Sequence, residues 1–260
     1  MYDPAPAAEL LLAARRPGEQ ISKLPESIAP TNLEQAYVVQ DRLADLLARD
    51  RGMPAGYKIG CTNQGARKML AIDSPFSGHC FTRDIRLNPT ILQSRDLHMI
   101  GIEPEIAIRV GEDMPGNGSW TAAGAATVVD AVMPAIEIVE SRFSTWPLMG
   151  PLAAIADNGV HRQLILGEAI PGWNRQSIES ATVCLKTDGT EVRKGRASNV
   201  DGGPFSALAW LANHLNQRGQ QVQSGDVITT GVMTDIYDGT AGQHIFADFG
   251  ILGMIQIEIV

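Results

Sequence analysis

Cysteine is scarce in this chain of 260 residues, and its few copies form no recognisable pattern. Cys61, Cys80 and Cys184 are odd in number, widely spaced and without a CxxC pair. Disulfide frameworks and structural zinc sites need paired or closely spaced cysteines. The spacing therefore excludes both, and three reduced thiols favour a reducing, cytoplasmic location.

Long apolar runs and basic runs are also missing. No segment approaches the ~20 apolar residues that span a bilayer, and no early segment has the pattern of a secretory signal. The formal net charge is −8, and no basic-aromatic stripe offsets it, which argues against general nucleic-acid binding. We therefore expect a cytoplasmic protein that binds neither nucleic acid nor a membrane.

Hydrophobic residues, by contrast, make up 44% of the chain, which is enough for a sizeable core. Residues 6–16 have the spacing of a short helix. A second helix is indicated by Thr31 and Glu34, which have the spacing of a capping box, and by apolar residues at helical period up to Gly52. The N-terminal part of the chain is therefore predicted to be largely helical.

After about residue 50 the pattern changes to short β-like runs separated by turn residues. One strong helix is predicted to start at Pro204 and to stop before Gly219. Residues 111–124, rich in glycine and proline, predict an exposed hairpin loop or flap. The fold class that follows is α+β, with a helical region over residues 1–70 and a β-rich catalytic domain over residues 71–260.

Three glutamates occur inside apolar, strand-like segments. Glu103 and Glu105 are two residues apart, so their side chains point to the same face of a strand. Glu137 is bracketed by isoleucines in a second such segment. Burying a carboxylate costs too much unless a cation meets it, and Mg²⁺ or Mn²⁺ prefers oxygen ligands. The three acids therefore predict a divalent-metal site, although an antiparallel strand with one wet face would also carry solvated acids.

The remaining polar residues support fewer alternatives. The five histidines lack HxH or HxxxH spacing, which argues against a histidine-based zinc site, and His161 is the one that lies near a candidate site segment. Cys61 has no evident base partner and is not predicted to be a nucleophile. Glu140 and Arg142 are interpreted as a structural ion pair. Asp157 lies in a turn with asparagine and glycine, which makes it a candidate to orient water or move a proton.

Several motifs, taken in order, cover nearly the whole chain and resemble those of one known family. They are Gly56-Tyr-Lys58-Ile-Gly60-Cys-Thr62, Glu103-Pro-Glu105-Ile-Ala, Pro134-Ala-Ile-Glu137-Ile-Val-Glu-Ser-Arg142, Ala156-Asp157-Asn158-Gly159, Ala209-Trp210-Leu-Ala-Asn213, Gly225-Asp-Val-Ile-Thr-Thr-Gly231 and Ala247-Asp-Phe-Gly250-Ile-Leu-Gly253. The chain resembles the 2-keto-4-pentenoate hydratase and 4-oxalocrotonate decarboxylase family, within the fumarylacetoacetate hydrolase superfamily.

This resemblance implies a fold and a set of site residues. The fold is a compact β-roll or sandwich of fumarylacetoacetate hydrolase type, in a homo-oligomer. Glu103, Glu105 and Glu137 take the family's metal-ligand positions, and Lys58 takes that of its active-site lysine. The metal is expected to be Mg²⁺ or Mn²⁺, and the lysine is expected to position negative charge on a small 2-keto or 2-hydroxydienoate acid.

The function implied is a hydro-lyase that adds water to 2-hydroxy-2,4-dienoates and yields 4-hydroxy-2-keto acids in the meta-cleavage catabolism of aromatic compounds. An alternative is a decarboxylase of 4-oxalocrotonate type, for which Arg142 or Arg162 is a candidate counter-charge to a second carboxylate. A further alternative is a low-activity structural partner of a pathway enzyme. It is prompted by Phe76, which stands where many members have the aspartate of Pro-Asp-x-Gly.

Overall fold

Two β-sheets organise the molecule in the computed structural model, which describes residues 2–116 and 119–260. A mixed eight-stranded sheet has the order β2-β1-β10-β5-β6-β7-β3, with β11 paired to β5, and a five-stranded sheet has the order β4-β13-β12-β8-β9. The strands are β1 Pro54–Gly60, β2 Phe76–Phe81, β3 Ile85–Leu87, β4 Thr90–Leu92, β5 Gly101–Val110, β6 Val129–Val139, β7 His161–Leu166, β8 Thr182–Thr187, β9 Thr190–Arg196, β10 Val227–Val232, β11 Tyr237–Asp238, β12 His244–Asp248 and β13 Met254–Ile259.

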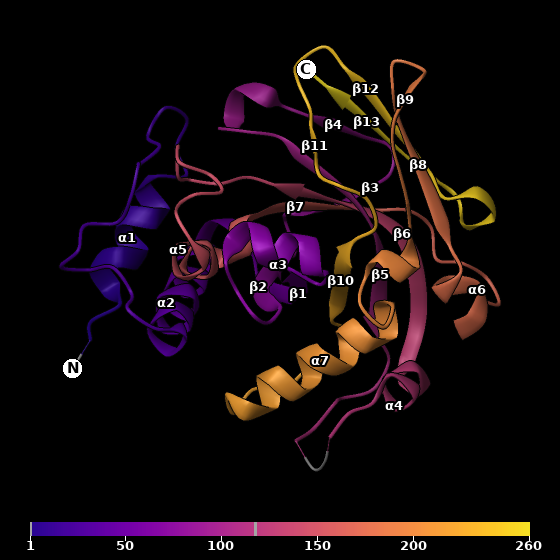
Figure 1. Ribbon diagram of the computed structural model, residues 1–260, viewed down its shortest axis with the longest axis horizontal. Coiled ribbons are helices and arrows are strands. Elements are labelled where there is room, and N and C mark those ends of the chain that lie inside the picture. The colour runs from indigo at the N-terminus through magenta and orange to yellow at the C-terminus, as the bar shows by residue number, and fades with distance from the viewer. Residues whose placement is uncertain (1, 117–118) are drawn as a thin grey trace.

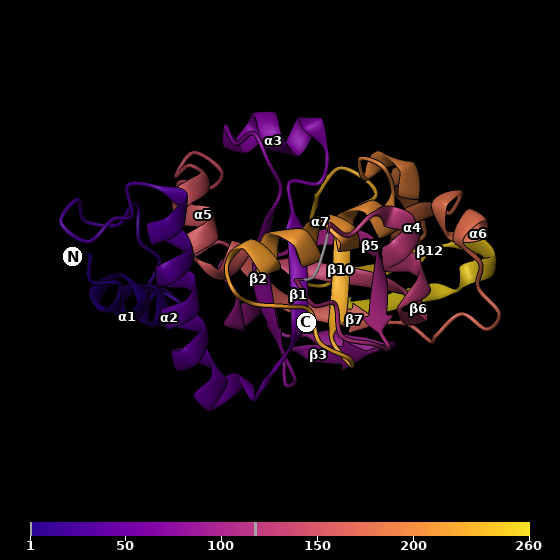
Figure 2. The same cartoon turned by 90° about the horizontal axis from the view of Figure 1, so that it is seen from below.

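The helices lie around these sheets. In Figure 1 the helices α1, α2 and α5 form a group on the N-terminal side, opposite the five-stranded sheet, and α7 runs beside β10. In Figure 2 the short helix α3 projects at the top of the view, and its Leu70 packs into a hydrophobic cluster below it. The α-helices are α1 Ala5–Ala13, α2 Leu33–Arg51, α3 Gln64–Leu70, α4 Ala122–Thr127, α5 Pro151–Ala156, α6 Arg175–Glu179 and α7 Pro204–Gln217.

Both N-terminal helices and the helix at Pro204 confirm the sequence prediction, but the predicted cap of α2 was wrong by one residue. Asn32 is the cap, because its side-chain oxygen accepts a hydrogen bond from the backbone N–H of Gln35 at 2.9 Å. Thr31 instead donates its backbone N–H to the Gln35 side chain. Asparagine and threonine both cap helices, so the spacing alone did not select between them.

The predicted loop over residues 111–124 contains more structure than expected. Residues 117 and 118 lie outside the described residues. On one side of them Met114 forms a bridge with Val222, and on the other side α4 begins after its cap, Thr121. The prediction of an exposed hairpin loop or flap was therefore wrong for the start of α4, whose six residues are too few to give a clear helical period.

Strand β1 connects the helical region to the large sheet, because it pairs with β10 in parallel and with β2 antiparallel. A division of the chain near residue 70 stays a prediction. The buried isoleucines Ile102, Ile106 and Ile136 belong to the main core, on one face of the large sheet. Among the described residues, no helix has both the length and the apolar character needed to cross a membrane.

Candidate metal and catalytic site

The pairing of β5 with β6 brings the three glutamates together. Glu103 lies directly opposite Glu137, and Glu105 follows on the same face of β5. The neighbouring isoleucines point the other way, into the core. One carboxylate oxygen from each glutamate lies within 4.8 Å of the others. The hydrophobic alternation of the two strands therefore fixes the position of an acidic cluster on the opposite face of the sheet.

Each of the two fully buried carboxylates has one oxygen engaged and one oxygen without a hydrogen-bond partner among the described residues. Glu105 Oε2 accepts a hydrogen bond from the backbone N–H of Gly231 at 2.7 Å, and its Oε1 has no partner. Glu137 Oε1 lies 2.9 Å from Lys58 Nζ and 2.8 Å from His161 Nδ1, and its Oε2 has no partner. Buried polar atoms without partners are rare in folded proteins. Converging free carboxylate oxygens fit a hard divalent cation.

The electrostatics of the cluster point the same way. Burial raises the pKa of Glu103 to about 7, against the lowering effect of Lys58. Burial and the charges of its two neighbours also raise the pKa of Glu105. Burial would raise the pKa of Glu137 too, but Lys58 and His161 outweigh it and lower that pKa. Without a further cation, the three carboxyl groups are therefore not all ionised easily, because Lys58 and His161 lower the pKa of Glu137 only.

Gly231 is required by the local backbone. Its φ of 108° is in a region that favours glycine, and a Cβ there would collide with the side chain of Thr62. The close approach of Thr62 and the bond to Glu105 therefore both depend on this glycine. The predicted motif that ends at Gly231 has a structural role in orienting a carboxylate.

Lys58 lies on β1 and is 2% exposed. Besides Glu137, its ammonium donates a hydrogen bond to the carbonyl of Gly159 at 3.1 Å. Burial alone would lower the pKa of Lys58, but the charges of the three glutamates outweigh it and raise that pKa. Lys58 is therefore held as a cation, which fits the role of positioning negative charge better than that of accepting a proton.

A strained turn presents that carbonyl to Lys58. Asn158, Gly159 and Val160 have φ values of 55°, 62° and 55°, three left-handed residues in succession. Such a conformation costs of the order of 1–3 kcal/mol for each non-glycine residue. The Asn158 side chain holds the turn in place, since it accepts from the His79 N–H at 2.7 Å and donates to the His79 carbonyl at 2.9 Å. Sequence reasoning recognised the motif but not this function of the turn.

Asp157 lies beside the turn, but its side chain faces arginines. Its carboxylate is 3.1 Å from Arg15 Nη2 and 3.3 Å from Arg142 Nε, and it accepts a hydrogen bond from the Arg142 backbone N–H. Both guanidiniums are almost fully buried. The cluster of possible metal ligands among the described residues does not include Asp157. Its role in orienting water or moving a proton stays a prediction.

The predicted pairing of Glu140 with Arg142 was wrong. Glu140 pairs with Arg162 at 3.2 Å, whereas the Arg142 guanidinium donates to the main-chain carbonyls of Glu140 and His161. Residues two apart on an extended chain suggest a pair, but the turn before β7 brings Asp157 to Arg142 instead.

Burial raises the pKa of the Cys61 thiol to about 12, in agreement with the prediction that this cysteine is no nucleophile.

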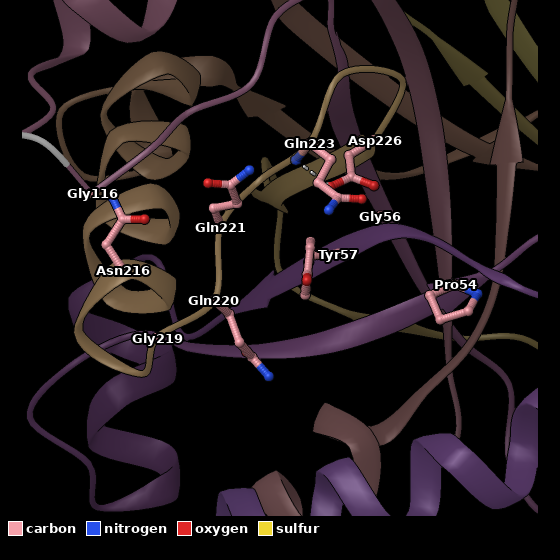
Figure 3. Close-up of a pocket in the computed structure, with 10 residues that line it drawn as sticks. All are labelled: Pro54, Gly56, Tyr57, Gly116, Asn216, Gly219, Gln220, Gln221, Gln223 and Asp226. Atoms are coloured by element: carbon pink, nitrogen blue, oxygen red, sulfur yellow. Dashed lines mark hydrogen bonds between the residues drawn. The ribbon is translucent and has the colours of Figure 1, made fainter.

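A separate pocket of about 570 Å³ lies on the other side of β1. Tyr57, which precedes Lys58 and therefore faces away from it, points into this pocket, and side-chain amides surround it (Figure 3). Neither Lys58 nor any of the three glutamates lines it. The acidic cluster and this pocket are therefore distinct.

Residues 66–255 match the family described as fumarylacetoacetate (FAA) hydrolase, C-terminal. The chain is 29% identical to TodF product hydratase of Pseudomonas putida strain F1, over 95% of this chain and 91% of that protein. It is 27% identical to 2-keto-4-pentenoate hydratase 2 of Dechloromonas aromatica, over 97% and 96%. The fold matches 4-oxalocrotonate decarboxylase from Pseudomonas putida G7, complexed with magnesium and adipate, with a TM-score of 0.90, 23% identity and coverage of 99% and 97%.

The match covers most of the chain and agrees with the resemblance and the fold class that the motifs predict. The chain belongs to the FAA hydrolase C-terminal family.

Proposed function

We propose that this chain is a divalent-metal-dependent hydratase that adds water to 2-hydroxy-2,4-dienoates and forms 4-hydroxy-2-keto acids. The observation that carries the proposal is the cluster of three glutamates, with two buried free carboxylate oxygens beside a buried lysine. Relatives named as hydratases that align along almost the full length support the reaction. A structural relative that holds magnesium supports the choice of a divalent cation.

Glu103, Glu105 and Glu137 would hold Mg²⁺ or Mn²⁺, each through one oxygen. When bound, the cation supplies Lewis-acid stabilisation of negative charge on a 2-oxo or 2-enol oxygen. Gly231 and His161 fix the other oxygen of Glu105 and Glu137, so each carboxylate presents its free oxygen in a defined direction. Such supporting contacts orient ligands and tune their basicity.

Lys58 is the lysine whose positive charge lies beside the three glutamates. Its contact with Glu137 raises its pKa, so Lys58 stays a cation that also donates a hydrogen bond to the turn and that can stabilise an anionic substrate. In the proposed reaction the 2-hydroxy proton is lost and a proton is added at C5, which gives a 2-oxo-3-enoate. Water then adds across C3 and C4, with the hydroxyl group on C4. Lys58 favours these steps by offsetting the charge that develops on the C2 oxygen.

Asp157 is proposed to take part through the turn that follows it. Arg15 and Arg142 pair with Asp157 and so anchor the start of the turn, residues 157–160. The carbonyl of Gly159 in that turn accepts a hydrogen bond from Lys58. A direct role in water orientation or proton transfer is the alternative, and the two are separated by the variant described below.

The test is turnover by metal-stripped protein to which Mg²⁺ or Mn²⁺ is restored. Metal-dependent loss of 2-hydroxypenta-2,4-dienoate, with 4-hydroxy-2-oxopentanoate as product, supports the hydratase. Stoichiometric carbon dioxide from 2-oxohex-3-enedioate supports the decarboxylase instead. Metal binding without turnover of either acid supports the third alternative, a low-activity partner of a pathway enzyme.

The cellular setting is a further part of the proposal. Cys61, Cys80 and Cys184 are free thiols, which fits a reducing cytoplasm. A homo-oligomer and a pathway-enzyme partner stay predictions from the family resemblance. Light scattering on the purified chain measures the first, and co-purification with a tagged copy measures the second.

A further inference from the structure

A cavity of about 450 Å³, here called the arginine cavity, lies between the ends of helices α1 and α2 and the turn that joins β2 to β3. Its volume is in the range of small-molecule sites, about 300–1,000 Å³. The lining is strongly basic although the chain has a net charge of −8, because it contains five arginines and only two aspartates. The lining residues are Leu12, Arg15, Arg16, Leu47, Asp50, Arg51, Arg83, Asp84 and Arg86.

Three of these arginines form no ion pair among the described residues. Arg16 and Arg86 are exposed, and Arg83 donates a hydrogen bond to a main-chain carbonyl at the end of α2, at 3.1 Å. Arg51, by contrast, pairs with Asp84 at 2.9 Å. A guanidinium keeps its charge in proteins. The arginine cavity therefore has more positive charge than its own acids offset.

Arg15 is the buried member of this lining. Its side chain is 9% exposed, and its Nη2 lies 3.1 Å from the carboxylate of Asp157. Its Nε is buried and has no hydrogen-bond partner in the part of the chain that the structure describes, which is rare in folded proteins. Burial lowers the pKa of Arg15, and the charge of Arg51 acts in the same direction, against that of Asp157. An anion in the cavity would offset the repulsion between the two guanidiniums.

The end of α2 explains only part of this charge. Arg51 is the last residue of α2, and Arg83 donates to the carbonyl of Asp50 beside it. The carbonyl end of a helix attracts cations, but it is equivalent to only about half a negative charge. Arg16 follows α1 and Arg86 lies on β3, so capping of α2 does not explain their positions.

We propose that the arginine cavity binds a small anion that carries a phosphate or pyrophosphate group. Such a group offers several acceptor oxygens and more than one negative charge, and a guanidinium pairs with it through two parallel hydrogen bonds. Leu12 and Leu47 offer apolar surface to the carbon atoms of the same ligand. Arg15 is held by Asp157 before the ligand binds, which reduces the entropy lost on binding. The site is separate from the three glutamates and does not depend on the proposed reaction.

The test is a calorimetric titration of pyrophosphate into the full chain in the absence of divalent cations. Without Mg²⁺ the pyrophosphate stays unchelated, and no metal at the glutamates can hold it there. We expect one pyrophosphate to bind per chain, and the midpoint of thermal unfolding to rise with its concentration. Inorganic phosphate is expected to bind at least about tenfold more weakly, because it contacts fewer guanidiniums.

Arg16→Gln and Arg86→Gln isolate the contribution of the cavity. Both side chains are exposed and form no ion pair among the described residues, so both variants should fold as the wild-type chain does. Each is expected to weaken the binding of pyrophosphate at least about fivefold, because a charge-assisted hydrogen bond is lost. The matched control is Arg95→Gln, which removes an exposed arginine outside the cavity and should leave the affinity unchanged.

Three results would overturn this proposal. Pyrophosphate that does not bind, or that both variants bind as tightly as the wild-type chain, removes the anion from the cavity. Tighter binding of tricarballylate, weakened by the same two substitutions, assigns the cavity to a polycarboxylate in place of a phosphate. An oligomer that dissociates in both variants, measured by light scattering, assigns these arginines to an interface between copies of the chain.

Discussion

Glu103 lies directly opposite Glu137 across the antiparallel pair of β5 and β6. Both carboxylates are on the same face of the large sheet as the side chain of Lys58. Like charges in directly opposed positions destabilise a sheet. Burial adds to this repulsion and raises the pKa of Glu103 to about 7. A folded chain without metal therefore retains repulsion that a bound cation would relieve.

Glu103→Gln should separate stability from metal binding. In metal-free protein at pH 8 the change removes one of two opposed charges, so we expect the free energy of unfolding to increase by up to about 1 kcal/mol. We also expect the affinity for Mg²⁺ to fall at least about tenfold, because one proposed anionic ligand is lost. Thermal unfolding with and without Mg²⁺ measures both effects.

The matched control for this variant is Glu258→Gln, which neutralises an exposed glutamate on β13. It should change neither the metal-free stability by more than about 0.5 kcal/mol nor the response to Mg²⁺. Glu103→Gln protein that still gained the full stabilisation from Mg²⁺ would contradict the three-glutamate site.

Lys58→Met should lower kcat strongly without abolishing metal binding. Lys58 contacts Glu137 and is held as a cation, so its removal takes away the protein charge that faces a developing oxyanion. Loss of one such group typically lowers kcat by about 10²–10³-fold. Because the variant makes the cluster more negative, Mg²⁺ affinity should be kept or increased. Steady-state kinetics and calorimetric Mg²⁺ titration give the two readouts, with the exposed Lys68→Met as control. Parallel loss of both would instead make Lys58 a structural support of the cluster.

Asp157→Asn distinguishes a positioning role from a proton-transfer role. The change keeps the shape but removes the carboxyl group between Arg15 and Arg142, both almost fully buried. Burial raises the pKa of Asp157 to about 8, so the comparison is made at about pH 9, where this group is ionised. Breaking a buried pair typically costs about 3–5 kcal/mol of folding free energy. We expect a loss of stability of this size, with kcat of the folded protein reduced less than about tenfold. Unchanged stability with a loss of more than about a hundredfold in kcat would support the predicted role in proton transfer.

The sequence was sufficient where hydrophobic alternation fixes direction. The isoleucines around Glu103, Glu105 and Glu137 must enter the core, so the glutamates must face the other way, and their meeting follows once β5 pairs with β6. Helices α2 and α7 were predictable for the same reason, since apolar residues repeat at helical spacing along them.

Contacts between distant segments could not be predicted in this way. The pairing of His161 with Glu137 depends on the left-handed turn before β7, and nothing in Asn158-Gly159-Val160 indicates that valine adopts a positive φ. The partner of Arg142 also differs from expectation, because tertiary structure brings Asp157 to it and brings Arg15 to the same carboxylate. Side-chain charges specify that a partner is needed, but the fold decides which partner is within reach.

Metal binding should weaken as the pH falls below about 7. The pKa of Glu103 is raised to about 7 and that of Glu105 is also raised, so protons compete with the cation for these oxygens below that value. When each bound Mg²⁺ displaces one proton from these carboxyl groups, its affinity should fall about tenfold for each pH unit below 7.

The metal-free chain should show the opposite trend in stability. A raised carboxyl pKa means that the folded state binds more protons than the unfolded state between the usual pKa of glutamate and the raised value. This contribution to stability is present at low pH and is lost as the pH rises to about 7. Mg²⁺ titrations and unfolding curves at pH 6 and pH 8 test both trends, and Glu103→Gln should reduce both, leaving the part that Glu105 contributes. Mg²⁺ affinity that did not change between pH 6 and pH 8 would mean that protons and metal do not share these carboxylates.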